Sequence, residues 1–458
     1  MKKVTLIIVC VFAYNFISAQ TIAAGGYHSF AVCSDSTLRA WGHNAQGQLG
    51  NGTNTSSNVP VQVSALPGIT AFSGGSLHSL ALKNDGTERA WGWNSVGQLG
   101  NGTNTDSNIP MQVSALSGIT AIAGGGYHSL ALKNDGTVWA WGANSEGQLG
   151  NGTNDSSNIP VQVNALSSIA VVAGGGRHSL ALKNDGTVRA WGYNGDGELG
   201  NGTNIWSNVP VQVNTLSGIT AIAGGFRHSL ALKNDGTVWT WGENNDGQLG
   251  NGTNTDSNVP VQVSTLTGIT AIAGGHYHSL ALKNDGTVWA WGYNFYGQLG
   301  NSTNTSSNVP VQVSALSGIT AIAGGYYHSL AKENDGTVWA WGSNGSGQLG
   351  NGTNTDSNVP VQVINLCQIL TATPENNPLA SLNIFPNPAA NELKIENAKS
   401  KIERVEVYDV VGENVFRSHI SNLISQISID VSSLRSGIYF ITVTDDAGNK
   451  VVRKVVKM

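Results

Sequence analysis

Short apolar runs separated by polar loops fill most of the chain. Between residues 119 and 163 the runs are Ile119–Ala123, His128–Leu132, Val138–Trp141 and Ile159–Val163. Each run is four or five residues long, which is the length of a strand and too short for a stable helix. This stretch therefore predicts four β-strands.

The connections between these runs predict how the strands pair. Asn134-Asp135-Gly136 joins the second run to the third, and its glycine allows the positive φ that a tight hairpin turn needs. The second and third strands should therefore be antiparallel neighbours. The segment from residue 142 to 158 is a polar loop in which Leu149 is expected to be buried.

The same pattern occurs seven times at a spacing of 50 residues, and no copy is missing or shifted. The invariant positions are His28, His78, His128, His178, His228, His278 and His328, followed by Trp41, Trp91, Trp141, Trp191, Trp241, Trp291 and Trp341. Such a period predicts a solenoid, a propeller or an array of small units. A linear stack would expose its two end copies, which are as apolar as the others, whereas a closed ring buries them. The sequence thus predicts an all-β protein whose residues 20–373 form a seven-bladed β-propeller.

Two segments could supply the innermost strand of the first blade. Gln368–Thr373 falls where an eighth copy would start, and Gln20–Ala23 falls at the same place in copy one. The sequence leaves both alternatives open. Cys33 lies in blade one, and Cys367 lies near the place where the last blade is predicted to meet the first, which we call the seam. We therefore expect a disulfide between the two that closes the ring.

The copies carry the motif G-G-x-x-H-S-L-A-L-K-N-D-G-T-V-W-A-W-G-x-N-x-x-G-Q-L-G-N-G-T, as in Gly124–Thr153, and Asn-Asp-Gly occurs in six of the seven. This motif resembles the repeats of the regulator of chromosome condensation superfamily, and the resemblance extends from residue 21 to about residue 366. It implies a seven-bladed propeller. The nucleotide-exchange activity of that superfamily depends on particular surface elements, such as an inserted wedge. Because the seven copies here are uniform and contain no such insertion, we do not expect this chain to share that activity.

The amino terminus resembles a secretory signal peptide over residues 1–19. Lys2 and Lys3 precede the mostly apolar segment Val4–Phe16, and Ile17-Ser18-Ala19 is a plausible cleavage site. This apolar segment is too short for a stable membrane span and no later segment has enough consecutive apolar residues for one, so the mature chain should lack an integral membrane segment. Loss of both lysines leaves 21 basic against 28 acidic side chains, a balance that disfavours nucleic acid as a partner.

The repeats end at Leu366, and residues 374–382 read as a polar, proline-marked linker. Alternating runs beyond it predict a small Ig-like β-sandwich at residues 383–458. Ile384–Pro388, Val407–Gly412, Leu434–Phe440 and the basic end Lys450–Lys457 resemble the type A sorting domain of the type IX secretion system. The resemblance implies a Bacteroidetes-type envelope, contact with the secretion machinery, and release or attachment at the outer-membrane surface. An ordinary accessory β-domain is the alternative.

The recurrent polar residues have structural explanations. Equivalent histidines lie at equal spacing around a ring, so they do not converge on a tetrahedral metal site unless they line a narrow centre. Since each precedes a serine in an apolar strand, we interpret it as the donor or acceptor of a hydrogen bond within its own blade. Asn-Asp-Gly supplies one carboxylate per turn, too few for Ca²⁺. No constellation typical of catalysis stands out, so we predict no catalytic residue, metal or cofactor.

The positions that vary among the copies lie just before the histidine and just after Trp-Gly. Blade loops carry ligand contacts, and exposed aromatic side chains favour binding of sugars, peptides or protein surfaces. Neutral drift after recent duplication is the alternative. The predicted binding residues are Trp93, Tyr193, Phe226, Tyr277, Tyr293, Phe295, Tyr296, Tyr326 and Tyr327.

These observations predict a secreted or cell-surface, non-catalytic scaffold that binds a protein or glycan on one propeller face. A secreted inhibitor that plugs the active site of an enzyme is one alternative. A glycan-active enzyme is the other, and it would need acids or bases gathered in one sector of the ring.

Overall fold

A computed structural model describes residues 21–33, 35–64, 66–367, 382–396, 402–409, 413–424, 426–446 and 450–458. The chain divides into two compact units, Met1–Cys367 and Gln368–Met458. The predicted signal peptide, nearly all of the predicted linker and the candidate closing strand Gln368–Thr373 lie outside the described residues. No helix in the described ranges has the length and hydropathy that a transmembrane span requires.

The first unit consists of seven four-stranded sheets, which confirms the predicted all-β fold. Blade one contains β1 (Ile22–Ala24), β2 (His28–Val32), β3 (Leu38–Gly42) and β4 (Ser57–Gln62), and blade two contains β5 (Ile69–Gly74), β6 (His78–Lys83), β7 (Glu88–Gly92) and β8 (Ser107–Gln112). Blade three contains β9 (Ile119–Gly124), β10 (His128–Lys133), β11 (Val138–Gly142) and β12 (Ser157–Gln162), and blade four contains β13 (Ile169–Gly174), β14 (His178–Lys183), β15 (Val188–Gly192) and β16 (Ser207–Gln212). Blade five contains β17 (Ile219–Gly224), β18 (His228–Lys233), β19 (Val238–Gly242) and β20 (Ser257–Gln262). Blade six contains β21 (Ile269–Gly274), β22 (His278–Lys283), β23 (Val288–Gly292) and β24 (Ser307–Gln312), and blade seven contains β25 (Ile319–Gly324), β26 (His328–Glu333), β27 (Val338–Gly342) and β28 (Ser357–Gln362).

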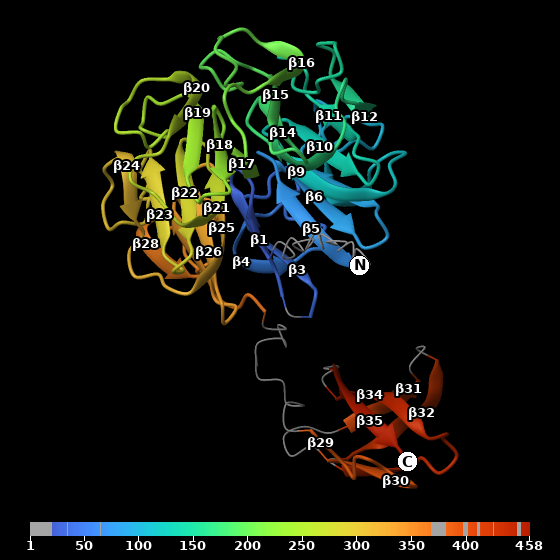
Figure 1. Ribbon diagram of the computed structural model, residues 1–458. Helices are drawn as coiled ribbons and strands as arrows, with labels where there is room; N and C mark the ends of the chain where they lie inside the picture. The colour runs from blue at the N-terminus through green and yellow to red at the C-terminus, as the bar shows by residue number, and fades with distance from the viewer. Residues whose placement is uncertain are drawn as a thin grey trace, which may run out of the picture. The chain divides into compact units, whose positions relative to one another are not determined.

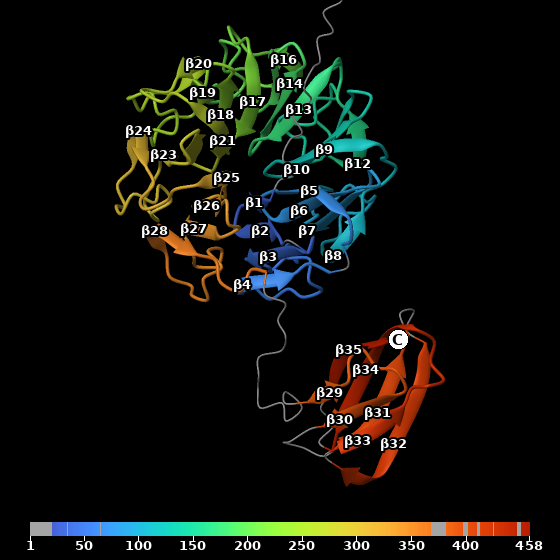
Figure 2. The same cartoon turned by 60° about the horizontal axis from the view of Figure 1, so that its bottom comes forward.

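The sheets are arranged around a central axis, as Figures 1 and 2 show, and every pairing within a blade is antiparallel. The first strand of each blade lies innermost and contacts the first strands of both neighbours, including β1 against β25 at the seam. The amino-terminal segment Ile22–Ala24 is thus the inner strand of blade one, and that blade is built from copy one alone.

Hydrogen bonds between neighbouring blades repeat at all seven junctions. The conserved histidine of each blade bonds the serine hydroxyl group of the next blade through Nε2 at 2.8–3.0 Å. The prediction of a bond within each blade is therefore wrong. A repeat period cannot distinguish the adjacent serine from its equivalent 51 residues away. Burial lowers the pKa of these histidines, to about 4 for His128, so the rings are neutral at physiological pH.

The seam between blades seven and one carries the same contacts. His328 Nε2 bonds Ser29 Oγ at 2.9 Å, and Trp41 donates its indole N–H to the Gln348 carbonyl group at 2.9 Å. The conserved tryptophans are fully buried, and Trp41 packs in a core shared with Leu330 of blade seven. A core shared by two blades leaves no apolar end face, which is the physical reason for closure.

Cys33 and Cys367 form a disulfide whose Cα atoms are 5.3 Å apart. The bond joins residues separated by 334 positions and ties the chain after β28 to blade one. It adds a covalent link to the hydrogen-bonded seam.

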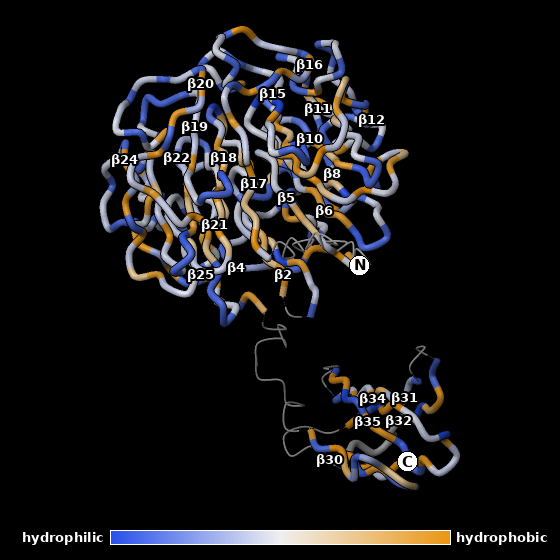
Figure 3. The backbone as a smooth tube through the Cα atoms, in the orientation of Figure 1, coloured by the Kyte–Doolittle hydropathy of each residue, from blue (hydrophilic) through white to orange (hydrophobic). Residues whose placement is uncertain are grey.

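The second unit is a small β-sandwich. One sheet contains β29 (Asn383–Phe385), β30 (Glu392–Glu396) and β33 (Gln426–Asp430), and the other contains β31 (Ile402–Tyr408), β32 (Asn414–Ile424), β34 (Gly437–Asp445) and β35 (Lys450–Lys457). Leu393, Val405 and Ile441 lie in its buried core. Figure 3 shows hydrophobic positions following the strands of each unit, with many polar positions in the loops.

Candidate functional site

Two loops of every blade meet on one face of the ring. Since the strands alternate in direction, the loop after the first strand and the loop after the third strand emerge at the same end of the sheet, whereas the Asn-Asp-Gly turn lies at the other end. The residues before the histidine and after Trp-Gly therefore share this end, which we call the loop face.

Nine rings on the loop face form one connected network, the aromatic cluster, and His43 adjoins its edge 6.3 Å from Tyr27. Neighbouring centroids are 3.8–6.4 Å apart, and the rings come from blades five, six, seven and one. The members are Tyr27, Phe226, His276, Tyr277, Tyr293, Phe295, Tyr296, Tyr326 and Tyr327. The structure thus brings together seven of the nine residues that the sequence singled out.

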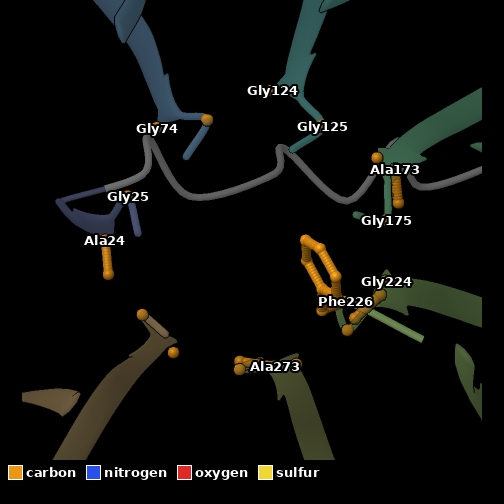
Figure 4. Close-up of a pocket in the computed structure, with 18 of the residues that line it drawn as sticks. Ala24, Gly25, Gly74, Gly124, Gly125, Ala173, Gly175, Gly224, Phe226 and Ala273 are labelled. Carbon is orange, nitrogen blue, oxygen red and sulfur yellow. The ribbon is translucent and has the colours of Figure 1, made fainter. Parts of the chain in front are cut away.

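The inner end of the aromatic cluster lies at a central cavity of about 360 Å³. Alanine and glycine residues of the inner strands surround it, and the Phe226 ring points into it, as Figure 4 shows. His276 stacks on Phe226 with centroids 3.8 Å apart, and Tyr326 lies 4.3 Å from His276. Burial lowers the pKa of His276 to about 3, so this ring is neutral and acts as an aromatic surface.

Glycine at the same register in other blades makes room for these rings. Gly26, Gly126 and Gly176 occupy the positions that correspond to Phe226, His276 and Tyr326. A Cβ atom on Gly176 would overlap the Phe226 ring. Phe226 of blade five thus lies against Gly176 of blade four, and Tyr326 of blade seven lies against Gly26 of blade one.

The outer end of the aromatic cluster is open to solvent. Phe295 is 64% exposed, whereas Tyr277, Tyr293, Tyr296 and Tyr327 are half-buried. Three of these tyrosines, Tyr277, Tyr293 and Tyr327, lie at the corners of a nearly equilateral triangle with centroid separations of 6.1, 6.1 and 6.2 Å. This group is called the tyrosine triad below.

The other two predicted residues lie in separate pairs. Trp93 contacts Tyr127 at 5.9 Å, and Tyr193 contacts Trp206 at 4.9 Å. Trp206 is 49% exposed, beside Ile205 at 75%.

Sequence reasoning missed Trp206, Tyr27, Tyr127 and His276 as members of these contacts. The signal for Trp206 was available, because six copies have Ser or Asp where copy four has this tryptophan.

Carboxylate groups gather on the loop face of blades three to five. They belong to Glu146, Asp196, Glu198, Glu243 and Asp246. Sequence reasoning missed this asymmetric set, although Glu146, Asp196 and Asp246 share one register in three successive copies. Two of the five are paired: Arg177 contacts Glu146 at 3.2 Å and Arg227 contacts Asp196 at 3.5 Å.

Glu198 is the most deeply buried of these acids, and burial raises its pKa to about 9. It stands where the other six copies have glutamine. Its Oε2 accepts the Asp196 backbone N–H at 3.0 Å, the same bond that Gln148 makes with the Glu146 backbone N–H. At neutral pH the protonated Glu198 thus resembles the glutamine that it replaces.

Comparisons with known proteins agree with this architecture. A model described as RCC1-like domain matches residues 117–378, and RCC1 repeat models match residues 37–82 and 90–132. Human WBSCR16 is 25% identical, with a TM-score of 0.65 over 71% of this chain and 93% of that one. Prp20p from Saccharomyces cerevisiae is 26% identical, with a TM-score of 0.65 over 75% of this chain and 87% of that one.

Two curated relatives match short segments only. The endo-acting ulvan lyase of Formosa agariphila is 34% identical over 83 residues, 18% of this chain, and the mitochondrial RCC1 domain-containing protein RUG3 of Arabidopsis thaliana is 42% identical over 45 residues, 10% of this chain. The matched segments span 16% and 10% of those proteins' own lengths.

The second unit matches a model described as secretion system C-terminal sorting domain over residues 383–458. Such a domain directs its chain to the secretion machinery, so the protein is secreted or displayed at the cell surface. The RCC1-like model covers more than half of the sequence, and the chain therefore belongs to the RCC1-like domain family.

Proposed function

We propose that this exported propeller is a non-catalytic binding protein that holds a macromolecular ligand against its aromatic cluster. One observation carries the proposal: nine rings from four neighbouring blades form a single network on the loop face. Large rings with few rotatable bonds give much contact area at low entropic cost, and tyrosine adds a hydroxyl group for hydrogen bonding.

The arrangement argues against neutral drift as its source. Drift after duplication would spread aromatic residues evenly over the blades. Every blade does carry at least one at the variable loop positions, but six of the twelve Tyr, Phe and Trp residues there belong to blades six and seven. Ring closure does not require them either, because the histidine, serine and tryptophan contacts are complete at every junction.

The carboxylate group of blades three to five is the observation that favours an enzyme. Glu198, with its raised pKa, and Asp196 could be taken for an acid and base pair. However, Glu198 makes the hydrogen bond of a structural glutamine, and Asp196 is paired with Arg227. The match to ulvan lyase extends over 83 residues, only 18% of this chain, which is too little to support a shared activity. We therefore favour binding over catalysis.

A screen of the exported full chain against extracellular glycans and proteins tests the proposal. The key variant replaces Tyr293, Phe295 and Tyr296 by alanine. Trp139→Arg is the control, because Trp139 lies on a strand and blades one, two and four carry arginine at its register. We expect at least tenfold weaker binding in the triple variant and unchanged binding in the control, with similar melting temperatures.

A triple variant that binds every ligand as well as the parent would refute the assignment of this face. Stoichiometric inhibition of a hydrolase by the parent would identify the protein as an inhibitor.

A further inference from the structure

An acid and an arginine meet at two successive blade junctions of the loop face. Glu146 of blade three pairs with Arg177 of blade four, and Asp196 of blade four pairs with Arg227 of blade five. The two residues of each pair are 31 positions apart. The next junction has Asp246 at the register of the acid, but the residue 31 positions later is Tyr277.

This substitution leaves Asp246 without the cation that its counterparts have. Among the residues that the structure describes, none forms an ion pair with its carboxylate or donates a hydrogen bond to it. The side chain is half-buried, and burial raises its pKa. Tyr277 stands at the register of Arg227, the residue that pairs with Asp196, and this register places Asp246 beside the tyrosine triad.

The tyrosine triad has the geometry to receive a cation. Its rings are tilted by 36–69° to one another, and a positive group above the triangle would lie within the roughly 6 Å range of cation–π contacts from all three ring centroids. The neighbouring junction contains an example within the protein. There the Arg227 guanidinium group lies 5.9 Å from the Tyr193 ring centroid while it pairs with Asp196.

We propose that the tyrosine triad and Asp246 bind the side chain of an arginine or lysine from a polypeptide partner. The partner would supply the positive group that Arg177 and Arg227 supply at the preceding junctions. This inference rests on the proposed function and names the ligand class of the same face.

Charge and exposure favour a basic polypeptide over a neutral glycan. Apart from Glu198, which is protonated at neutral pH, the carboxylate group of blades three to five has four acids against two arginines, so it complements a basic partner. Phe295 extends the triad outward as an exposed apolar surface, and arginine beside aromatic residues is typical of the centre of protein interfaces. A neutral sugar would leave Asp246 unpaired.

Titration of the full chain with acetyl-Gly-Arg-Gly-amide and with its citrulline counterpart tests the inference, since citrulline has nearly the same shape but no charge. At physiological ionic strength we expect the arginine peptide to bind about tenfold more tightly. A lysine peptide tests whether an ammonium group also binds.

Three substitutions locate the site. Asp246→Asn should abolish most of the preference for arginine over citrulline. Tyr277→Arg should remove peptide binding, because the new arginine would occupy the triad and pair with Asp246 as Arg227 does with Asp196. Glu146→Gln at the same register in blade three is the control and should leave binding unchanged. Blades four and five already carry arginine at position 277's register, so we expect Tyr277→Arg to fold with a normal melting temperature.

Equal affinity for the arginine and citrulline peptides would overturn the inference, as would a folded Tyr277→Arg variant that binds like the parent. If a ligand from the screen is lost on triple substitution but retained by Asp246→Asn and Tyr277→Arg, the proposed function stands and the cation site is wrong. A neutral oligosaccharide that binds independently of Asp246 would give that outcome.

Discussion

The Tyr326 hydroxyl group of blade seven forms a hydrogen bond with the Ser76 hydroxyl group of blade two, across the glycine of the blade between them. That glycine is Gly26, where an added Cβ would lie 2.6 Å from the Ser76 carbonyl oxygen and 3.2 Å from the Tyr326 ring. Large and small residues thus complement each other around the cavity, and the shape of the aromatic cluster depends on small residues, Gly26 and Ser76, that contribute no ring to it.

Gly176→Ala tests this complementarity. The new methyl group would overlap the Phe226 ring and lie 2.5 Å from the Phe226 carbonyl oxygen. We expect a loss of about 1–3 kcal/mol in the free energy of unfolding, measured by denaturant titration, together with weaker ligand binding. Gly345→Ala is the matched control, because nothing lies within 4 Å of its added Cβ. Equal stability of the two variants would contradict the packing described here.

Glu88→Val should stabilise the propeller. Glu88 is fully buried, neither carboxyl oxygen has a hydrogen-bond partner within the described ranges, and burial raises its pKa well above the usual value. The equivalent residue is leucine in blade one and valine in blades three to seven. Because ionising a buried, unpaired carboxyl group is costly, we expect a gain of about 2 kcal/mol at pH 7.

The pH dependence provides an independent check on Glu88. An acid whose pKa is raised on folding does not destabilise the folded state at a pH below its unfolded pKa, because it is protonated in both states. Above that value the free energy of unfolding falls as pH rises. The parent should therefore lose stability relative to Glu88→Val as pH rises from about 4.5, near the usual pKa of glutamate. A stability difference between the two that does not vary with pH would show that folding does not raise the pKa of Glu88.

Glu198→Gln tests whether this acid acts structurally. The pKa of about 9 predicts that the parent loses stability relative to the variant as pH rises from about 4.5 towards 9. We expect thermal unfolding to give similar midpoints at pH 4 and a higher midpoint for the variant at pH 8. Ligand affinity should be unchanged, since glutamine makes the same bond in the other copies. A catalytic activity that this variant abolished would instead support an enzyme.

Trp206→Ser should also raise stability. In six blades a Ser or Asp at this register accepts the backbone N–H of the loop asparagine, as Ser156 does from Asn144 at 3.2 Å. Within the described residues, the Asn194 backbone N–H has no such acceptor. We expect the restored bond to contribute about 1 kcal/mol, measured by denaturant titration. A lower stability would mean that packing of Trp206 on Tyr193 outweighs the lost bond.

The sequence predicts the fold well because the spacing of 50 residues and the Asn-Asp-Gly turns leave few alternatives. The same regularity does not show which copies contact each other. The sequence therefore predicts a partner for His28 in its own blade, whereas the actual partner is Ser79 of the next blade. Convergence of Tyr277, Tyr293 and Tyr327 could be anticipated in part, since both loops emerge at one end of the blade. The contact between the registers of Asp246 and Tyr277 could not be predicted from the sequence. It becomes visible only once the structure shows that Glu146 pairs with Arg177, 31 positions later.

Footprinting of the protein in complex with a ligand selected by the screen tests the central claim most directly. Hydroxyl radicals modify exposed aromatic side chains, so Tyr293, Phe295 and Tyr296 should be strongly protected on binding while Trp139 and the Asn-Asp-Gly side of the ring keep their reactivity. Protection confined to that opposite side, with Phe295 as reactive as in the free protein, would contradict the account.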